Sequence, residues 1–348
     1  MDTIEGNVKL KSDITVEELD IVKKYFSTLK SPIGFRFCDV LEESRGRERG
    51  LILKISYPRY YYGNNAYLVT SKSKCLEVQE HFVNSIQEDT FLKEVVLGIK
   101  LTRVDIPFTY YMEKGLEFNS YWNIYKIFAS VYTIRKRNAR AKGYLDLLDD
   151  KYETVIYSDN GKTDKSSNNR LMIYNQELNL RNKLSEEEFE RVSKDYPDLI
   201  SRMRLEVAKR IRRKGFSLDE FKNFDILSEY FQQYKNYILE NILNKDDIEQ
   251  IYDEKAEEVA KKLADERERR SFTYENFIYR NFYAIGDYEI LRRAVKIAIP
   301  NRKTREGAIT TIRKILEEYE SSTTVKVMNN YSTITEMREY IKSLEIKD

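Results

Sequence analysis

The sequence predicts an α+β protein, in which an antiparallel sheet of the βαββαβ type carries helices on one face and a helical domain follows. Two observations lead to this fold class. Residues 1–215 alternate short strand patterns with longer helical ones, in the order of the split βαβ plan. After Gly215 almost every segment has the helical period. We therefore expect a boundary near 214–220, between an α+β region (1–215) and a helical region (216–348).

The predicted order of elements in the first half of the α+β region is βαββα, followed by a long strand. Its elements are a strand (8–11), a helix opened by Thr15, two strands (34–40 and 51–57) around a charged hairpin loop, a helix (74–88) and a long strand (95–111). Thr15 is a good N-cap residue, and acidic residues follow it in the first helical turn. Because this half runs into the strand that opens the next one, residues 1–100 and 101–215 are expected to be related halves.

The second half shows the full βαββαβ order. Its elements are a strand (101–108), a helix (119–142), a strand (153–158), a polar loop (159–169), a strand (170–175), a helix opened by Ser185 (184–195) and a strand (200–208). In this plan one antiparallel sheet carries its helices on a single face. The other face is then expected to be open to solvent.

Bulk composition excludes several classes of protein. The 60 Lys and Arg nearly cancel the 58 Asp and Glu, so only local clusters of charge can indicate a partner. Cys38 and Cys75 are too few for a disulfide framework or a zinc site, and we expect buried, reduced thiols. The apolar runs are shorter than the roughly 18–20 residues of a membrane-spanning helix, and the start has no signal-peptide pattern. These features indicate a cytoplasmic protein.

The single histidine, His81, limits the chemistry further. One histidine cannot support a two-histidine zinc motif or a paired-histidine metal site, and its helical surroundings favour a surface or capping role. Any catalysis by this chain is therefore expected to use carboxylates, tyrosines and cations.

Three strands are predicted to place polar side chains on one face of the sheet. Alternate side chains of a strand share a face, so each of these strands has one apolar face and one face with arginine beside a carboxylate or a tyrosine. If the strands are neighbours, Asp105, Tyr174 and Glu206 converge on the open face. The arginines that surround them are Arg103, Arg170, Arg202 and Arg204.

Such a constellation suits DNA strand cleavage. Two carboxylates can hold Mg²⁺ or Mn²⁺ through oxygen ligands, and the ion polarises a phosphate. A tyrosine can attack phosphorus and hold the DNA covalently, while arginines position the backbone. The alternative is that an exposed sheet face carries ordinary salt bridges.

Four segments of the chain, TRVDIPF, ETVIYS, NRLMIYNQELNLRNK and SRMRLEVAKR, resemble the replication initiators of rolling-circle plasmids and filamentous phages. The gene II/X-like group of the replication initiation factor superfamily is the most similar, and the resemblance covers roughly residues 1–215. It implies Tyr174 as the nucleophile, Asp105 and Glu206 as metal ligands, and Arg204 as the partner of the glutamate. Tyr157, on the neighbouring strand, is the second choice of nucleophile.

Two positions depart from the family pattern. Gln176 stands where the family usually has lysine, and Asn179 stands where a glutamate is expected. These departures favour a non-catalytic relative, namely a nucleic-acid-binding or inhibitor protein built on the same fold.

Clusters of cations supply candidate DNA contacts outside the sheet face. RKRNARAK (135–142) contains Arg135, Lys136 and Arg137, and RMRLEVAKRIRRK (202–214) contains a second cluster, Arg210, Arg212 and Arg213. In the helical region a turn at Gly286 and a break at Pro300 separate three helices, the last of them basic. This segment is either a helix-turn-helix, with Arg302, Lys303 and Arg305 at the start of its last helix, or a plain helical bundle.

Three functions are therefore compared. The first is a metal-dependent tyrosine nickase that cuts and rejoins one strand at a single-stranded or supercoiled origin, with a host helicase as a further partner. The second is the non-catalytic nucleic-acid-binding or inhibitor protein. The third is an interaction scaffold that does not bind nucleic acid.

Overall fold

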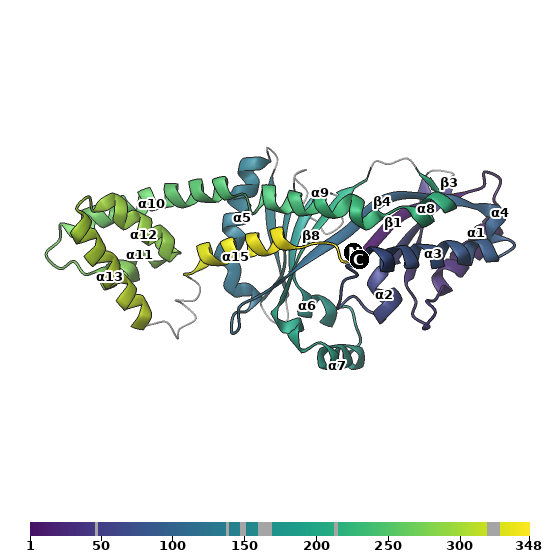
Figure 1. Ribbon diagram of the computed structural model, residues 1–348, viewed down its shortest axis with the longest axis horizontal. Helices are drawn as coiled ribbons and strands as arrows, with labels where there is room; N and C mark the ends of the chain where they lie inside the picture. Colours follow the sequence, from purple (N-terminus) through teal and green to yellow (C-terminus); the bar gives the residue numbers. More distant parts are fainter. Residues whose placement is uncertain (46–47, 137–138, 147–150, 159–168, 212–214, 319–327) are drawn as a thin grey trace. The chain divides into compact units, whose positions relative to one another are not determined.

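The computed structural model describes the chain except for residues 46–47, 137–138, 147–150, 159–168, 212–214 and 319–327. Most of the polar loop expected at 159–169 and of the Ser/Thr/Asn-rich connector near 321–331 therefore lies outside the described residues. The described part forms an α+β fold with a helical C-terminal region, as the sequence predicts (Figure 1).

Nine strands form one sheet, and every strand pairing with a described register is antiparallel. The strand order is β2-β3-β1-β4-β8-β7-β6-β5, and β9 pairs with β4. The strands are β1 (Thr3–Leu10), β2 (Cys38–Arg45), β3 (Glu48–Ser56), β4 (Val96–Tyr111), β5 (Arg140–Asp146), β6 (Lys151–Ser158), β7 (Asn169–Asn175), β8 (Arg202–Arg210) and β9 (Phe216–Ser217).

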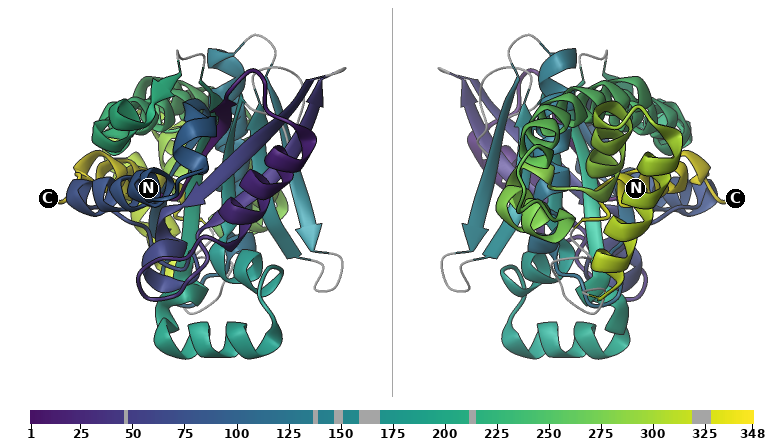
Figure 2. Two further views of the ribbon diagram at one scale, coloured as in Figure 1. Left: turned by 90° about the vertical axis from the view of Figure 1, so that its right-hand side faces the viewer. Right: turned by 90° about the vertical axis from the view of Figure 1, so that its left-hand side faces the viewer.

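The first half of the sheet follows the split βαβ plan. β1 lies between β3 and β4, so strands that are distant in the sequence are neighbours in space. The helices of this half are α1 (Val16–Thr28), α2 (Tyr57–Tyr62), α3 (Lys72–Glu88) and α4 (Leu92–Val95), and α1 packs against the strand layer (Figure 2). Thr15 and Glu18 form the capping box of α1, which confirms the expected helix start.

The second half differs from the predicted plan. The expected helix over 119–142 is wrong beyond Arg135: the structure has η1 (Phe118–Tyr121), α5 (Trp122–Arg135) and then the additional strand β5. RKRNARAK has no apolar stripe to bury as a helix, and its last residues pair with β6 instead, with Ala141 opposite Tyr157. The remaining short elements are α6 (Gln176–Arg181), α7 (Glu186–Asp195), η2 (Pro197–Ser201) and α8 (Leu218–Asn223).

The chain divides into two compact units, which we describe separately. The first contains residues 1–109, 162–237 and 344–348, and the second contains 110–161 and 238–343. The units do not coincide with the expected ranges, because composition changes near Gly215 while the chain remains in the first unit through α8 and most of α9 (Ile226–Asn241).

The second unit is built mainly from α10 (Lys245–Arg267), α11 (Tyr274–Ile285), α12 (Tyr288–Ala298), α13 (Arg302–Glu318) and α15 (Asn330–Ser343). Asp287, which is buried at the start of α12, connects three of these helices. Its carboxylate accepts hydrogen bonds from the Tyr252 hydroxyl on α10 (3.0 Å) and from the backbone N–H of Tyr331 on α15 (2.8 Å) and of Glu289 (2.7 Å). Shared capping of this kind fixes the helices without a disulfide.

Two further expectations can be compared with the structure. Cys38 and Cys75 are both buried and free, as expected. None of the helices in the described ranges is both long and apolar enough to cross a membrane.

Gly98 fixes the junction of β9 with β4. Its φ of +154° is rarely adopted by other residues, and a Cβ there would lie 2.0 Å from the carbonyl oxygen of Phe216. We expect Gly98→Ala to lower the free energy of unfolding by about 1–3 kcal/mol, because the substitution strains the backbone and separates the strands. Urea denaturation followed by circular dichroism measures this change.

Gly307 on α13 supplies the control. A Cβ at this position meets no atom within 4 Å, so Gly307→Ala should stabilise its helix by roughly 0.5–1 kcal/mol. Equal destabilisation by both substitutions would contradict the steric explanation for Gly98.

Candidate functional site

The predicted site residues come from three strands of the first unit. In the antiparallel pair of β7 and β8, Tyr174 lies opposite Arg204, and Met172 lies opposite Glu206. Paired residues of antiparallel strands point to the same face, so the phenol and the glutamate emerge on one side of the sheet. β4 contributes Asp105 from the other side of β8 in the strand order.

Direct contacts link these side chains. The Tyr174 hydroxyl donates to Glu206 Oε2 at 3.2 Å. Arg103 bridges the two acids: its Nε donates to Asp105 Oδ1 at 2.6 Å, and its Nη2 donates to Glu206 Oε1 at 3.3 Å. The prediction that Asp105, Tyr174 and Glu206 converge is therefore confirmed, and we call these three residues together with Arg103 the sheet cluster.

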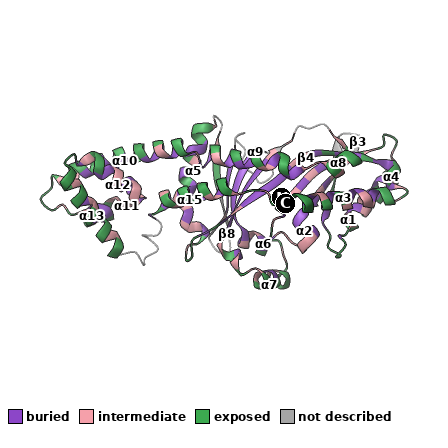
Figure 3. Cartoon of the chain, in the orientation of Figure 1, coloured by how far each residue is buried: buried purple, intermediate pink, exposed green. Residues whose placement is uncertain are grey.

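The prediction that this face is open is wrong. Asp105, Tyr174 and Glu206 are 7%, 6% and 6% exposed, and the central strands are buried along most of their length (Figure 3). Strand parity assigned the residues to the correct face but could not reveal the layer that covers it.

A backbone carbonyl lies over this polar face of the sheet. The oxygen of Ala66 accepts three hydrogen bonds, from Gln176 Nε2 (2.8 Å), Arg202 Nη1 (2.6 Å) and Arg204 Nη2 (3.0 Å). The segment around Ala66 is thereby held over the polar side of β8. Gln176, the departure from the family pattern, thus has a structural role in binding this carbonyl.

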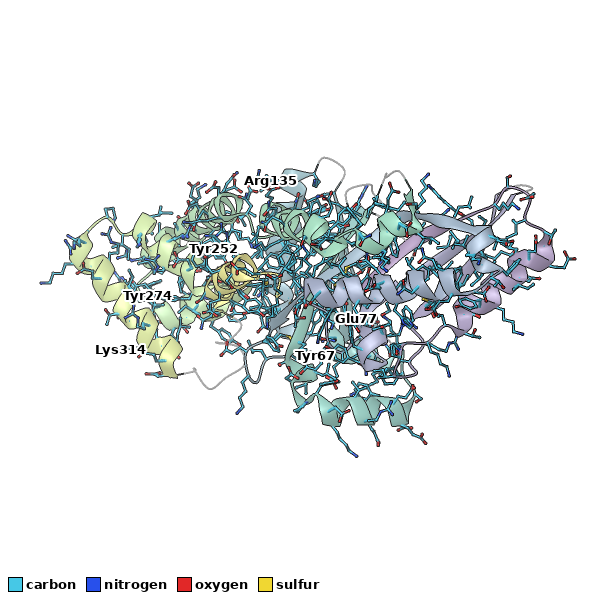
Figure 4. All side chains as sticks on the ribbon, turned by 45° about the vertical axis from the view of Figure 1, so that its right-hand side comes forward. Tyr67, Glu77, Arg135, Tyr252, Tyr274 and Lys314 are labelled. Carbon is cyan, nitrogen blue, oxygen red and sulfur yellow. The ribbon has the colours of Figure 1, made fainter. Side chains whose placement is uncertain are left out.

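The arginines expected to bind phosphate instead form contacts with other residues of the chain. Arg202 is 1% exposed, donates to both carboxylate oxygens of Asp198 at 2.6–2.9 Å, and lies over the ring of Tyr67, which Figure 4 labels. Arg204 is 2% exposed, and Arg170, also buried, donates to the sulfur of Met172. The expected exposure of these arginines on an open face is wrong, because each is covered by the segments it binds.

Burial also decides the protonation of the sheet cluster. It raises the pKa of Tyr174 well above the ordinary value, and the charge of Glu206 adds to the rise, whereas Arg204 opposes it. Burial likewise raises the pKa of Asp105, while the guanidinium of Arg103 opposes the rise. The phenol is therefore protonated, and a phenolate nucleophile is strongly disfavoured in this arrangement.

The sheet cluster does not fit a divalent cation as it is arranged. Arg103 already supplies the positive charge between the two carboxylates. Within the described ranges, no group of three or more His, Cys, Asp or Glu side chains could hold a metal ion. The Mg²⁺ or Mn²⁺ ligand set therefore stays a sequence-based prediction.

The second candidate nucleophile is buried too. Tyr157, in the second unit, is fully covered, and its hydroxyl donates to the backbone oxygen of Tyr125 at 3.0 Å. Its ring lies against Tyr132, so it serves the core under α5.

The basic stretches are described only in part. Arg137, Arg212 and Arg213 lie outside the described residues, as does the side chain of Arg210. Arg135 forms an ion pair with Asp247, and Lys136 is half-buried. Among the described cations of these stretches, Arg140 and Lys142 are exposed on β5.

The helical region contains the expected helix-turn-helix order. α12 and α13 are separated by three residues, Ile299 to Asn301, a turn length typical of that motif. The side-chain oxygen of Asn301, Oδ1, caps α13 by accepting a hydrogen bond from the backbone N–H of Thr304 at 3.0 Å. Arg302, Lys303 and Arg305 stand in the first turn, where Arg302 is 84% exposed and pairs with Glu306.

One face of α13 is free of packing contacts. Only Ala308 and Ile312 are buried among its side chains, and at about 100° per residue the opposite face is formed by exposed residues of both charges and by two small ones. These are Lys303, Glu306, Gly307, Thr310, Arg313, Lys314 and Glu317, which we call the α13 face (Figure 4 labels Lys314). No ion pair of either lysine is present among the described side chains.

Sequence reasoning missed two features. The Ala66 carbonyl had no signal, since a backbone acceptor can belong to any residue type. The exposed tyrosines Tyr279 and Tyr283 on α11 had a sequence signal, because both belong to the segment YENFIYRNFY and are spaced by four residues.

Comparison with known proteins adds no relative: no family model, curated protein or solved structure matches this chain.

The ion pairs of Arg103 can be tested by stability. Arg103→Met should lower the free energy of unfolding by about 3–5 kcal/mol, because it leaves two carboxylates buried without their cation. Chemical denaturation measures the loss.

Arg59→Met is the matched control. Arg59 pairs with the half-exposed Asp39, and removal of such a surface pair should cost at most about 1 kcal/mol. Similar losses in the two variants would show that Arg103 is not buried as described.

Proposed function

We propose that the chain is a DNA-binding protein that uses its helix-turn-helix, and that the sheet cluster stabilises the fold rather than cutting DNA. The observation that carries this proposal is the α13 face, a solvent-exposed helix surface on which Lys303, Arg313 and Lys314 flank the small residues Gly307 and Thr310, with Glu306 and Glu317 beside them. The closed state of the sheet cluster supports the non-catalytic form of the family resemblance.

The shape of the α13 face suits the major groove of DNA. A helix enters that groove when its exposed residues allow the backbone to come close, and Gly307 and Thr310 are small. The second helix of a helix-turn-helix presents its first residues to base edges, and here that turn contains Arg302, Lys303 and Arg305.

Charge supports the same assignment. The first turn of α13 has no acidic residue, and Lys314 adds a cation three turns further along. Phosphate contacts by such cations provide affinity without sequence preference, whereas base contacts by Thr310 and its neighbours provide specificity.

Removal of the two lysines tests the proposal. Lys303→Ala with Lys314→Ala should weaken binding to a random-sequence duplex, because two phosphate contacts are lost. The slope of log K against log salt should become shallower by about 2. Fluorescence anisotropy over a range of salt concentrations measures both quantities.

The control removes two exposed lysines elsewhere. Lys93→Ala with Lys114→Ala takes away the same charge and should leave duplex affinity within about twofold. Equal losses for both pairs would reject a specific role for α13.

A nicking activity is the second candidate function. The observation in its favour is the 3.2 Å contact between the Tyr174 hydroxyl and Glu206, since a carboxylate next to a phenol can accept the proton when oxygen attacks phosphorus. Attack on DNA would require the segment around Ala66 to leave the sheet cluster.

The two candidates differ in a single assay. We expect no relaxed circles and no covalent protein–DNA adduct after incubation with supercoiled DNA and Mn²⁺. An adduct that Tyr174→Phe abolishes, with DNA binding retained, would overturn the non-catalytic proposal and establish the nickase.

A further inference from the structure

Two tyrosines of the second unit are almost completely exposed. Tyr279 and Tyr283 on α11 are 85% and 98% exposed, whereas most other tyrosines of the described chain are buried or half-buried. They are four residues apart, so both lie on the side of α11 opposite the buried Phe277 and Ile285. A pair of large rings held in water needs a partner or a special reason, because it buries none of its apolar area.

The exposed rings offer a surface that suits a nucleobase. An exposed tyrosine ring is a flat aromatic surface on which a base can stack. α11 is kinked between the two tyrosines, where Asn281 has non-helical dihedral angles and donates to Glu266 at 3.0 Å.

The segment that contains α11 has an excess of cations, several of which are paired with acids of the chain. Arg269 and Arg270 are exposed just before the helix starts, and residues 267–318 contain twelve Lys and Arg against seven Asp and Glu. Arg280, between the two tyrosines in sequence, is exposed as well, although Glu266 pairs with it at 2.6 Å. An anionic chain with aromatic bases is complementary to such a surface.

We infer that Tyr279 and Tyr283 form a stacking site for unpaired bases of single-stranded nucleic acid. Bases in a duplex are covered by their neighbours and cannot stack on exposed side chains, whereas those of a single strand can. The site rests on the proposed function, since it extends DNA binding from the α13 face to the unpaired strand. It accepts any base, because every base has a π-face.

The test uses a labelled twenty-nucleotide oligothymidine and the full chain. Tyr279→Ala with Tyr283→Ala should weaken its binding at least about tenfold, because removal of each ring also removes the stacking interaction with a base. Tyr279→Phe with Tyr283→Phe keeps the rings and should bind within about twofold of the unchanged protein. All four substitutions are at exposed positions, and thermal unfolding checks that the fold is retained.

A second probe separates this inference from the proposed function. The alanine variant should bind random-sequence duplex as the unchanged protein does, while the Lys303→Ala, Lys314→Ala variant should lose duplex affinity. Unchanged oligothymidine binding by the alanine variant, with lysine-dependent duplex binding intact, overturns the stacking site alone. No duplex binding by the unchanged protein overturns the proposed function.

One further outcome identifies a different occupant. If the unchanged protein elutes as a dimer and the alanine variant as a monomer, with oligothymidine binding equal in both, the tyrosine pair is a contact between copies of the chain. That result also overturns the stacking site.

Discussion

The guanidinium of Arg103, held between Asp105 and Glu206, is the contact on which the centre of the first unit depends. A buried carboxylate without a cation is strongly unfavourable, and two adjacent ones are worse. By bridging β4 and β8, Arg103 lets both acids be covered, and the segment around Ala66 can then close over the sheet. The three donors on the Ala66 oxygen depend on this closure.

The same arrangement separates stability from chemistry. The contacts that satisfy the buried charges use the groups that catalysis would need, and burial raises the pKa of Tyr174. Exposed cations and aromatic rings occur instead on α11 and α13 of the second unit. The cationic and aromatic surfaces on which the proposals rest are therefore helical, whereas the centre of the sheet is buried.

Sequence patterns predicted the fold class and the face of each central strand, because alternation and helical periodicity are local properties. They also placed Tyr174 and Glu206 together. Sequence patterns failed where the outcome depended on segments that are distant in the chain. The last residues of RKRNARAK pair with β6 as a strand instead of continuing the helix. The polar face of the sheet is covered by the loop at Ala66, whose backbone oxygen accepts hydrogen bonds from the arginines. The succession of α11, α12 and α13 was predictable from Gly286 and Pro300, while the unpacked side of α13 required the structure.

The separation of Arg103 and Glu206 along the chain affects how the protein is made. They are 103 residues apart, so β1 to β4 leave the ribosome well before β8 exists. During that interval β4 is an edge strand with an unpaired row of backbone groups. Synthesis of β8 removes this edge, and slow translation through the intervening region would prolong the period in which the nascent chain can self-associate.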